Sequence, residues 1–314
     1  MIIGEKKFQY KWIENWAKIP DTKSGRENGR THGVVVLKNG NVIVFNQADP
    51  AILIFNKDGE LISSWGNRFG GAHGLTLTEE NGEEYLWLTD QYSGEVLKTD
   101  INGKTVLSMQ KPRLKLYEEK FYSPTWVAVF EERFGGNGDI WITDGYGTNL
   151  IHRFSKEGTY IKTISGEEGK AGLFNCPHAL FFDTRKSEPE LYIADRGNKR
   201  FQVYDAEGNY KRSFGNDFLN SPCGGVVKDN ILYVPELFAR LAILDEDDKL
   251  ITYLGSNEEA VKTKGWPNHP KELIKEGKFN SPHYMAVDDE DNLYVVEWIV
   301  GGRITKLEKV LIYQ

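Results

Sequence analysis

A repeated phrase places four of the six histidines of this 314-residue chain at one and the same position. The phrase consists of a small or turn-forming residue, then one residue that is histidine in four copies, here called the key residue, and then a run of apolar residues. Imidazole is a frequent ligand of zinc-like ions, so the pattern favours a metal site. The alternative is structural, with each imidazole capping the start of a strand, although the fold does not require histidine because two copies lack it. The six key residues are His32, His73, Thr125, His178, Cys223 and His283.

Each phrase opens a repeat of four predicted strands. An apolar strand starts the repeat, and a second strand ends in an acidic or amide residue. A hairpin follows, with Asp-Gly, Asn-Gly or Glu-Gly at its turn in four repeats and Asp247-Asp248 in the fifth, which is a strong strand-turn-strand signal. The second strands are predicted at residues 41–46, 85–90, 139–144, 190–195, 231–236 and 292–297.

Six such repeats predict an all-β fold, a six-bladed β-propeller of four-stranded antiparallel blades. We expect a single domain over residues 1–314, with blades beginning near residues 32, 73, 125, 178, 223 and 283. The last repeat is incomplete, so residues 8–16 are predicted to supply its outermost strand and close the ring. The alternative is that residues 310–314 fold back. The connector at 256–280 could hold short helices at 258–264 and 270–278.

Composition narrows the choice of partners. The net charge is −7, which argues against nucleic acid and favours a small-molecule substrate. No apolar stretch approaches the roughly 20 residues of a membrane helix, so no membrane partner is expected. Two cysteines make no disulfide framework, and residues 1–20 lack a signal-peptide core. These features predict a cytoplasmic protein.

The repeats resemble NHL repeats, most clearly at residues 174–179 and 191–204. Over about residues 33–306 the chain also resembles the peptidyl-α-hydroxyglycine α-amidating lyase family. That family is a six-bladed propeller that binds zinc through three histidines from alternate blades and uses a tyrosine as catalytic base. The resemblance implies that His73, His178 and His283 are metal ligands and that Tyr146, in Asp144-Gly145-Tyr146, is catalytic.

Three positions depart from this family. Gln47 stands where the family has an arginine, which indicates a substrate other than a peptidyl-hydroxyglycine. Tyr284 replaces an acidic calcium ligand, so the expected cofactor is a divalent metal, zinc first and calcium as the alternative. His32 has no counterpart among the family's ligands. It is a candidate catalytic residue, and a fourth ligand, a substrate contact and a structural role are its alternatives.

Further candidates are substrate-binding residues, namely Gln47, Arg196, Glu236 and Glu297. Arg196 could bind an anionic group or form an ion pair between blades. Glu236 and Glu297 end second strands where other repeats have aspartate, and the longer side chain reaches further. Three aspartates at that strand end, Asp90, Asp144 and Asp195, are expected to accept turn N–H groups.

Together these features predict a metal-dependent lyase that acts on a small polar hydroxylated substrate. Its reaction class would be C–O or C–N cleavage at a hydroxylated or hemiaminal-like carbon. One alternative is a non-catalytic NHL propeller that binds a protein or glycan. Another is a metal-dependent hydrolase, such as a lactonase, or a sugar-modifying enzyme, the latter suggested by an aromatic rim of Trp126, Trp266 and Trp298.

Overall fold

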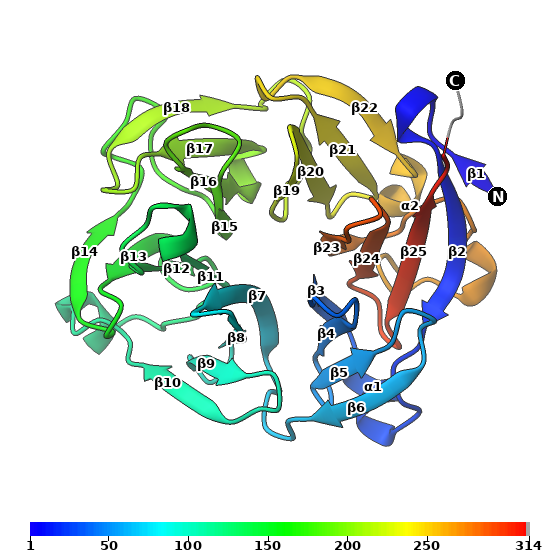
Figure 1. Cartoon of the computed structure of the whole chain (residues 1–314), viewed down its shortest axis with the longest axis horizontal. Helices are drawn as coiled ribbons and strands as arrows, with labels where there is room; N and C mark the ends of the chain where they lie inside the picture. Colours follow the sequence, from blue (N-terminus) through cyan, green and yellow to red (C-terminus); the bar gives the residue numbers. More distant parts are fainter. Residues whose placement is uncertain (312–314) are drawn as a thin grey trace. The chain divides into compact units, whose positions relative to one another are not determined.

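A computed structural model describes residues 1–311, and its regular structure is almost entirely β-strand (Figure 1). Within these residues 25 strands form six sheets, five with four strands and one with five. This is a six-bladed β-propeller, as the repeats predicted. Each second strand ends at the predicted residue, from Asn46 in the first blade to Glu297 in the last. Two compact units make up the chain, Met1–Phe69 with Asn230–Gln314, and Gly70–Asp229.

The first unit contains the sheet β3-β4-β5-β6, the strands β20-β21-β22 and the five-stranded sheet. Burial decreases outward, from fully buried β4 and β5 to exposed β6. The strands are β1 (Ile2–Ile3), β2 (Tyr10–Ala17), β3 (Thr31–Val36), β4 (Val42–Asn46), β5 (Ile52–Phe55), β6 (Leu61–Trp65), β20 (Ile231–Glu236), β21 (Arg240–Leu244), β22 (Leu250–Leu254), β23 (Pro282–Val287), β24 (Leu293–Glu297) and β25 (Arg303–Lys309).

The second unit contains three complete sheets and β19. Buried apolar residues from its first two sheets form one cluster around Trp87, Ile140 and Phe154. The strands are β7 (Ala72–Glu80), β8 (Glu83–Asp90), β9 (Val96–Asp100), β10 (Thr105–Met109), β11 (Trp126–Val129), β12 (Ile140–Asp144), β13 (Leu150–Phe154), β14 (Tyr160–Ile164), β15 (Pro177–Asp183), β16 (Glu190–Asp195), β17 (Arg200–Tyr204), β18 (Tyr210–Phe214) and β19 (Val226–Lys228).

The N-terminal strand completes the last blade, as predicted. Figure 1 shows β2, in blue, beside β25, in red, and the two strands are antiparallel with Trp12 opposite Leu307. Strand β1 adds a fifth, outer position that was not predicted. The alternative closure by residues 310–314 falls largely on residues 312–314, which lie outside the described residues. The edge of β25 is therefore covered by β2.

The hairpin turns also follow the sequence. Gly59, at the first turn, has φ +83°, a left-handed conformation that glycine adopts without strain. In the fifth repeat Asp248 takes this conformation at φ +64°. There the Asp245 carboxylate accepts the N–H groups of Asp247 and Lys249, which stabilises the turn without glycine.

Two local predictions need correction, and one short helix was not predicted. In the fifth blade the strand starts at Val226, three residues after Cys223, because Gly224 and Gly225 follow the key residue and disfavour strand. The connector at 256–280 holds α2 (Glu258–Lys262), but only a 3-10 turn at Lys271–Leu273. Helix α1 (Lys23–Asn28) was not predicted, although Thr22 caps it by accepting the Gly25 N–H. Within residues 1–311 no helix combines the length and apolarity needed to span a bilayer.

Candidate active site

In four blades the carboxylate that ends the second strand accepts a backbone N–H of the phrase, just before the key residue. In the second blade the Gly71 N–H donates to Asp90 Oδ2 at 2.9 Å, two residues before His73. The strand end and the phrase are thereby tied together, so the key residue has a defined position. The same bond joins Ser123 to Asp144 at 2.7 Å, Asn175 to Asp195 at 2.8 Å and Ser281 to Glu297 at 2.8 Å.

Backbone carbonyls orient the two histidines of the second unit. His73 Nδ1 lies 2.8 Å from the carbonyl oxygen of Thr125, and His178 Nδ1 lies 2.6 Å from that of Cys223. Each acceptor is the key residue of the next phrase along the chain. A carbonyl only accepts, so each Nδ1 carries the proton and each Nε2 carries the lone pair. A hydrogen bond of this kind orients metal-binding histidines in many proteins.

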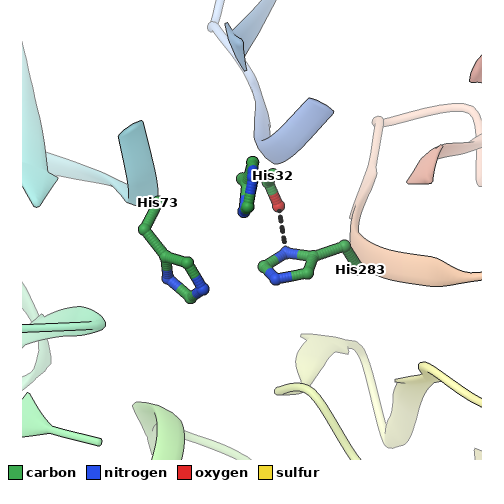
Figure 2. A group of neighbouring side chains, drawn as sticks. All are labelled: His32, His73 and His283. Atoms are coloured by element: carbon green, nitrogen blue, oxygen red, sulfur yellow. Dashed lines mark hydrogen bonds between the residues drawn. The ribbon is translucent and has the colours of Figure 1, made fainter. Parts of the chain in front are cut away.

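The first unit repeats this arrangement. His283 Nδ1 donates to the carbonyl oxygen of His32 at 2.8 Å, the bond drawn in Figure 2. The two rings lie edge to face with centroids 4.5 Å apart. Gln47 Oε1 lies 3.0 Å from His32 Nε2, so Gln47 serves as a buried partner of this histidine. Each of His32, His73 and His283 is buried and offers a ring nitrogen that could ligate a metal ion.

Tyr146 joins the histidine pair of the second unit to a cation. Its hydroxyl lies 3.1 Å from His73 Nε2 and accepts a hydrogen bond from Arg196 Nη2 at 3.1 Å. The ring centroids of His73 and His178 are 4.8 Å apart. Burial raises the pKa of Tyr146 to about 12, and the positive charge of Arg196 acts in the opposite direction. Tyr146 as a whole residue is 38% exposed, so a solute can approach it.

The guanidinium of Arg196 also faces both thiols of the chain. Its Nη2 lies 3.3 Å from Cys176 Sγ, and its Nη1 lies 4.0 Å from Cys223 Sγ. Cys176 has φ +55°, an uncommon conformation for a residue with a side chain. Sequence reasoning had given Cys176 no role, and its position two residues before His178 was the one available signal. Arg196 thus presents positive charge to the Tyr146 hydroxyl without a carboxylate among the partners that the described residues give it.

The two glycines beside Tyr146 are required by close packing. A Cβ on Gly145 would lie 2.3 Å from the carbonyl oxygen of Pro177, and one on Gly147 would lie 2.2 Å from Asp144 Oδ1. Neither neighbour is the flexible end of a long side chain. The glycines therefore allow the loop to pass close to the backbone that precedes His178.

Gly145→Ala is expected to lower the free energy of unfolding by about 1–3 kcal/mol, because the added methyl group forces the loop away from Pro177. Urea unfolding of the purified variant measures the loss. Gly70→Ala is the matched control, since a Cβ there meets nothing within 4 Å. Equal stability of the two variants would contradict the close-packing account.

Two predicted substrate-binding carboxylates have structural partners. Glu236 is fully buried and pairs with Arg240 at 2.5 Å. Glu297 is fully buried, accepts the N–H groups of Asn280 and Ser281, and pairs with Arg303 at 2.8 Å. Both carboxylates therefore have a structural role, and substrate binding by either one stays a prediction. Of the predicted aromatic rim, Trp126 is 1% exposed and its ring lies edge to face with that of His73, so the rim does not include it.

A buried polar cluster supports the loop that carries Tyr146. Tyr117 Oη lies 2.7 Å from Asp144 Oδ2 and 2.6 Å from His152 Nε2. Asp144 also accepts the backbone N–H of Thr148, which closes the turn around Tyr146. Tyr117 comes from the connector between β10 and β11, so this long connector has a positioning role that its sequence did not reveal.

The fold and its repeats define the chain as a six-bladed β-propeller whose repeats resemble NHL repeats. It is similar to human NHL repeat-containing protein 3, with 31% identity over 226 residues that span 68% of this chain and 61% of that protein. It is also similar to peptidyl-alpha-hydroxyglycine alpha-amidating lyase 1 of Drosophila melanogaster, with 28% identity over 76% of this chain and 45% of the relative. The chain thus spans less than two thirds of these relatives. The predicted resemblance is confirmed.

No family model matches the chain. Among solved structures, a streptogramin B lyase aligns with a TM-score of 0.62 and 12% identity, covering 97% of this chain and 99% of the lyase. A gluconolactonase from Xanthomonas campestris aligns with a TM-score of 0.62 and 12% identity, covering 90% and 88%. At this identity the likeness shows the fold alone, a propeller that lyases and lactonases share.

Proposed function

We propose that the chain is a metal-dependent lyase that cleaves a C–O or C–N bond of a small polar hydroxylated substrate. The position of the Tyr146 hydroxyl, 3.1 Å from His73 Nε2 and 3.1 Å from Arg196 Nη2, carries this proposal. The Tyr146 hydroxyl, which can give or take a proton, thus lies between an imidazole, a common metal ligand, and the guanidinium of Arg196. Tyr146 is also partly exposed to solvent. Relatives that include an amidating lyase add support.

His73 and His178 are proposed as metal ligands through Nε2, and the donor set fits such an ion. Both rings donate their Nδ1 proton to a carbonyl, which leaves the Nε2 lone pair for coordination. His283 has the same bond pattern in the first unit, and its role as a third ligand stays a prediction. Zinc is the ion that neutral imidazoles favour. When bound, such an ion supplies positive charge that polarises a substrate oxygen.

Tyr146 is proposed as the proton acceptor. His73 Nε2 has one lone pair, so it can accept the Tyr146 proton or ligate an ion, but not both. Arg196 remains on the tyrosine oxygen and stabilises negative charge there. In its deprotonated form Tyr146 takes the proton of the substrate hydroxyl, whose oxygen then forms a C=O bond as the C–N or C–O bond breaks. Tyr146 then passes that same proton to the leaving nitrogen or oxygen and returns to its deprotonated form, so the reaction needs no water and no oxidant.

The protein, purified without chelators or a histidine tag, is expected to retain about one equivalent of zinc-like metal, and His73→Ala and His178→Ala should each weaken binding by at least about 10–100-fold. Elemental analysis and chelator competition measure this. His269→Ala is the control, because His269 lies outside the repeated phrase and bonds to Thr263. His283→Ala tests the third predicted ligand in the same assay.

A metal-free native protein with an intact fold would contradict the enzyme proposal. It would favour the non-catalytic alternative, a propeller that binds a protein or glycan. That alternative has one specific observation in its favour, the replacement of the lyase family's arginine by Gln47, which the structure pairs with His32. Unchanged metal content in both histidine variants would also exclude the ligands named above.

A further inference from the structure

Three aromatic side chains form a partly exposed row in the first unit, here called the aromatic shelf: Phe238, Trp266 and Trp298. The centroids of Phe238 and Trp266 are 5.8 Å apart at 70°, and those of Trp266 and Trp298 are 6.3 Å apart at 63°. Phe238 is 36% exposed, and both tryptophans are half-buried. Large aromatic side chains left together at a surface are typical of binding sites.

The shelf is rigid because hydrogen bonds join the loops that carry Trp266 and Trp298 to the segment at Asn280 and Ser281. Trp266 Nε1 donates to the carbonyl oxygen of Asn280 at 2.9 Å, and Asn280 Nδ2 donates to that of Pro267 at 2.7 Å. The Trp298 N–H donates to the carbonyl oxygen of Ser281 at 2.9 Å. The rings are therefore held in place before any ligand arrives, which lowers the entropy lost on binding.

Arg30 extends the shelf with positive charge. Its guanidinium carbon lies 5.9 Å from the Trp298 ring centroid. Its Nη1 donates to the carbonyl oxygen of Asn28 at 3.3 Å, whereas its Nε is buried and has no hydrogen-bond acceptor. No carboxylate pairs with Arg30 among residues 1–311. By contrast, Arg240 and Arg303 of this unit are both bound by buried glutamates.

The backbone of Arg30 is fixed as well. Its carbonyl oxygen accepts the Gln47 N–H at 2.9 Å, and Gln47 in turn bonds to His32. A guanidinium that is fixed at its base and lacks an acidic partner retains donors for an anion, and it binds planar carboxylates well. A carboxylate that accepts from this guanidinium makes a charge-assisted hydrogen bond, which is about twice as strong as the bond to a neutral oxygen.

We propose that the aromatic shelf and Arg30 form a binding site for a small aromatic carboxylate. The flat apolar part of the ligand packs on Trp298 and its neighbours, and the carboxylate accepts hydrogen bonds from Arg30. Its residues belong to the first unit, whereas His73, Tyr146 and Arg196 belong to the second.

Calorimetric titration with phenylacetate and with phenylacetamide, its uncharged analogue of similar shape, tests this site. Phenylacetate should bind at least about tenfold more tightly than phenylacetamide, because the bond to Arg30 is charge-assisted. Added salt should weaken the binding of phenylacetate but not that of the amide. Binding is measured without turnover, so the result does not depend on whether the chain is a lyase.

Arg30→Gln should reduce phenylacetate affinity about tenfold, to the level of the amide, whereas Trp298→Leu should weaken both ligands. Arg113→Gln is the control, because it removes the same charge from an exposed arginine of the other unit. Phe238→Ala, at an exposed position, replaces Trp298→Leu if that variant does not fold. Equal binding of the two ligands, unchanged binding by Arg30→Gln, or a preference for a neutral sugar such as glucose would overturn the proposal.

Discussion

Arg303→Met is expected to lower the free energy of unfolding by about 3–5 kcal/mol, because it removes the cation from a buried ion cluster. Arg303 donates to Glu297 at 2.8 Å and to Glu14 at 2.7 Å, and its side chain is 4% exposed. Without Arg303 the fully buried Glu297 carboxylate keeps its desolvation penalty but loses its counter-ion. Glu297 also holds Ser281 in front of His283, and Glu14 lies on β2. Removal of the Arg303 guanidinium therefore destabilises both the attachment of β2 to the last blade and the position of the segment that precedes His283. Urea unfolding measures the loss of stability.

Two further variants separate burial from charge. Arg26→Met removes an arginine that pairs with Asp21 at the surface, and we expect a change within about 1 kcal/mol. Adding Glu297→Gln to Arg303→Met should recover part of the stability, because the amide oxygen can still accept the Ser281 N–H without a buried charge. If Arg303→Met were no more destabilising than Arg26→Met, the cluster would contribute little to the fold.

The second large effect concerns pH. Burial lowers the pKa of His152 from 6.5 to about 4. Between these values the unfolded chain binds a proton that the folded chain does not, so stability is lost as the pH falls through this window. The loss from this one group is about 3 kcal/mol, complete near pH 4 and absent above about pH 7. His152→Gln should remove this pH dependence, measured by urea unfolding at pH 8, 6, 5 and 4.

The groups that face His152 define the control. They are Tyr117, Tyr122 and Thr163, with Asp144 behind Tyr117, and burial raises the pKa of both Tyr117 and Asp144. Tyr117→Phe deletes one hydroxyl but leaves the imidazole, so it should lower stability by about 1 kcal/mol and keep the acid-side loss. Parallel pH profiles for wild type and His152→Gln would show that another group titrates.

Most of the fold could be predicted because its signals are local. Strand alternation and turn residues such as Asp58-Gly59 depend on neighbours a few positions apart, and the second strands end where predicted. Closure by the N-terminal strand was predicted from an incomplete repeat and is confirmed by the pairing of β2 with β25. Helix α1 was missed because it is six residues long and carries no apolar periodicity.

The site could be predicted in residue type but not in arrangement. The repeated phrase made His73 and His178 candidates, and the family resemblance made Tyr146 a candidate; their roles stay predictions. Nothing in the spacing indicated that Arg196, 50 residues further on, donates to the Tyr146 hydroxyl, or that Cys176 lies against the same guanidinium. Glu297 was predicted to bind substrate because its chain is longer than that of aspartate, and the structure instead gives it Arg303.

By itself, the sequence determined how many blades the protein has, where each strand ends, and which residue type stands at the key position of each phrase. Those features follow from side-chain chemistry at short separations along the chain. Only the tertiary structure decided which ring nitrogen of His73, His178 and His283 carries the proton. The carbonyl that orients His73 belongs to Thr125, 52 residues away, and only the packing of one sheet against the next brings the two together.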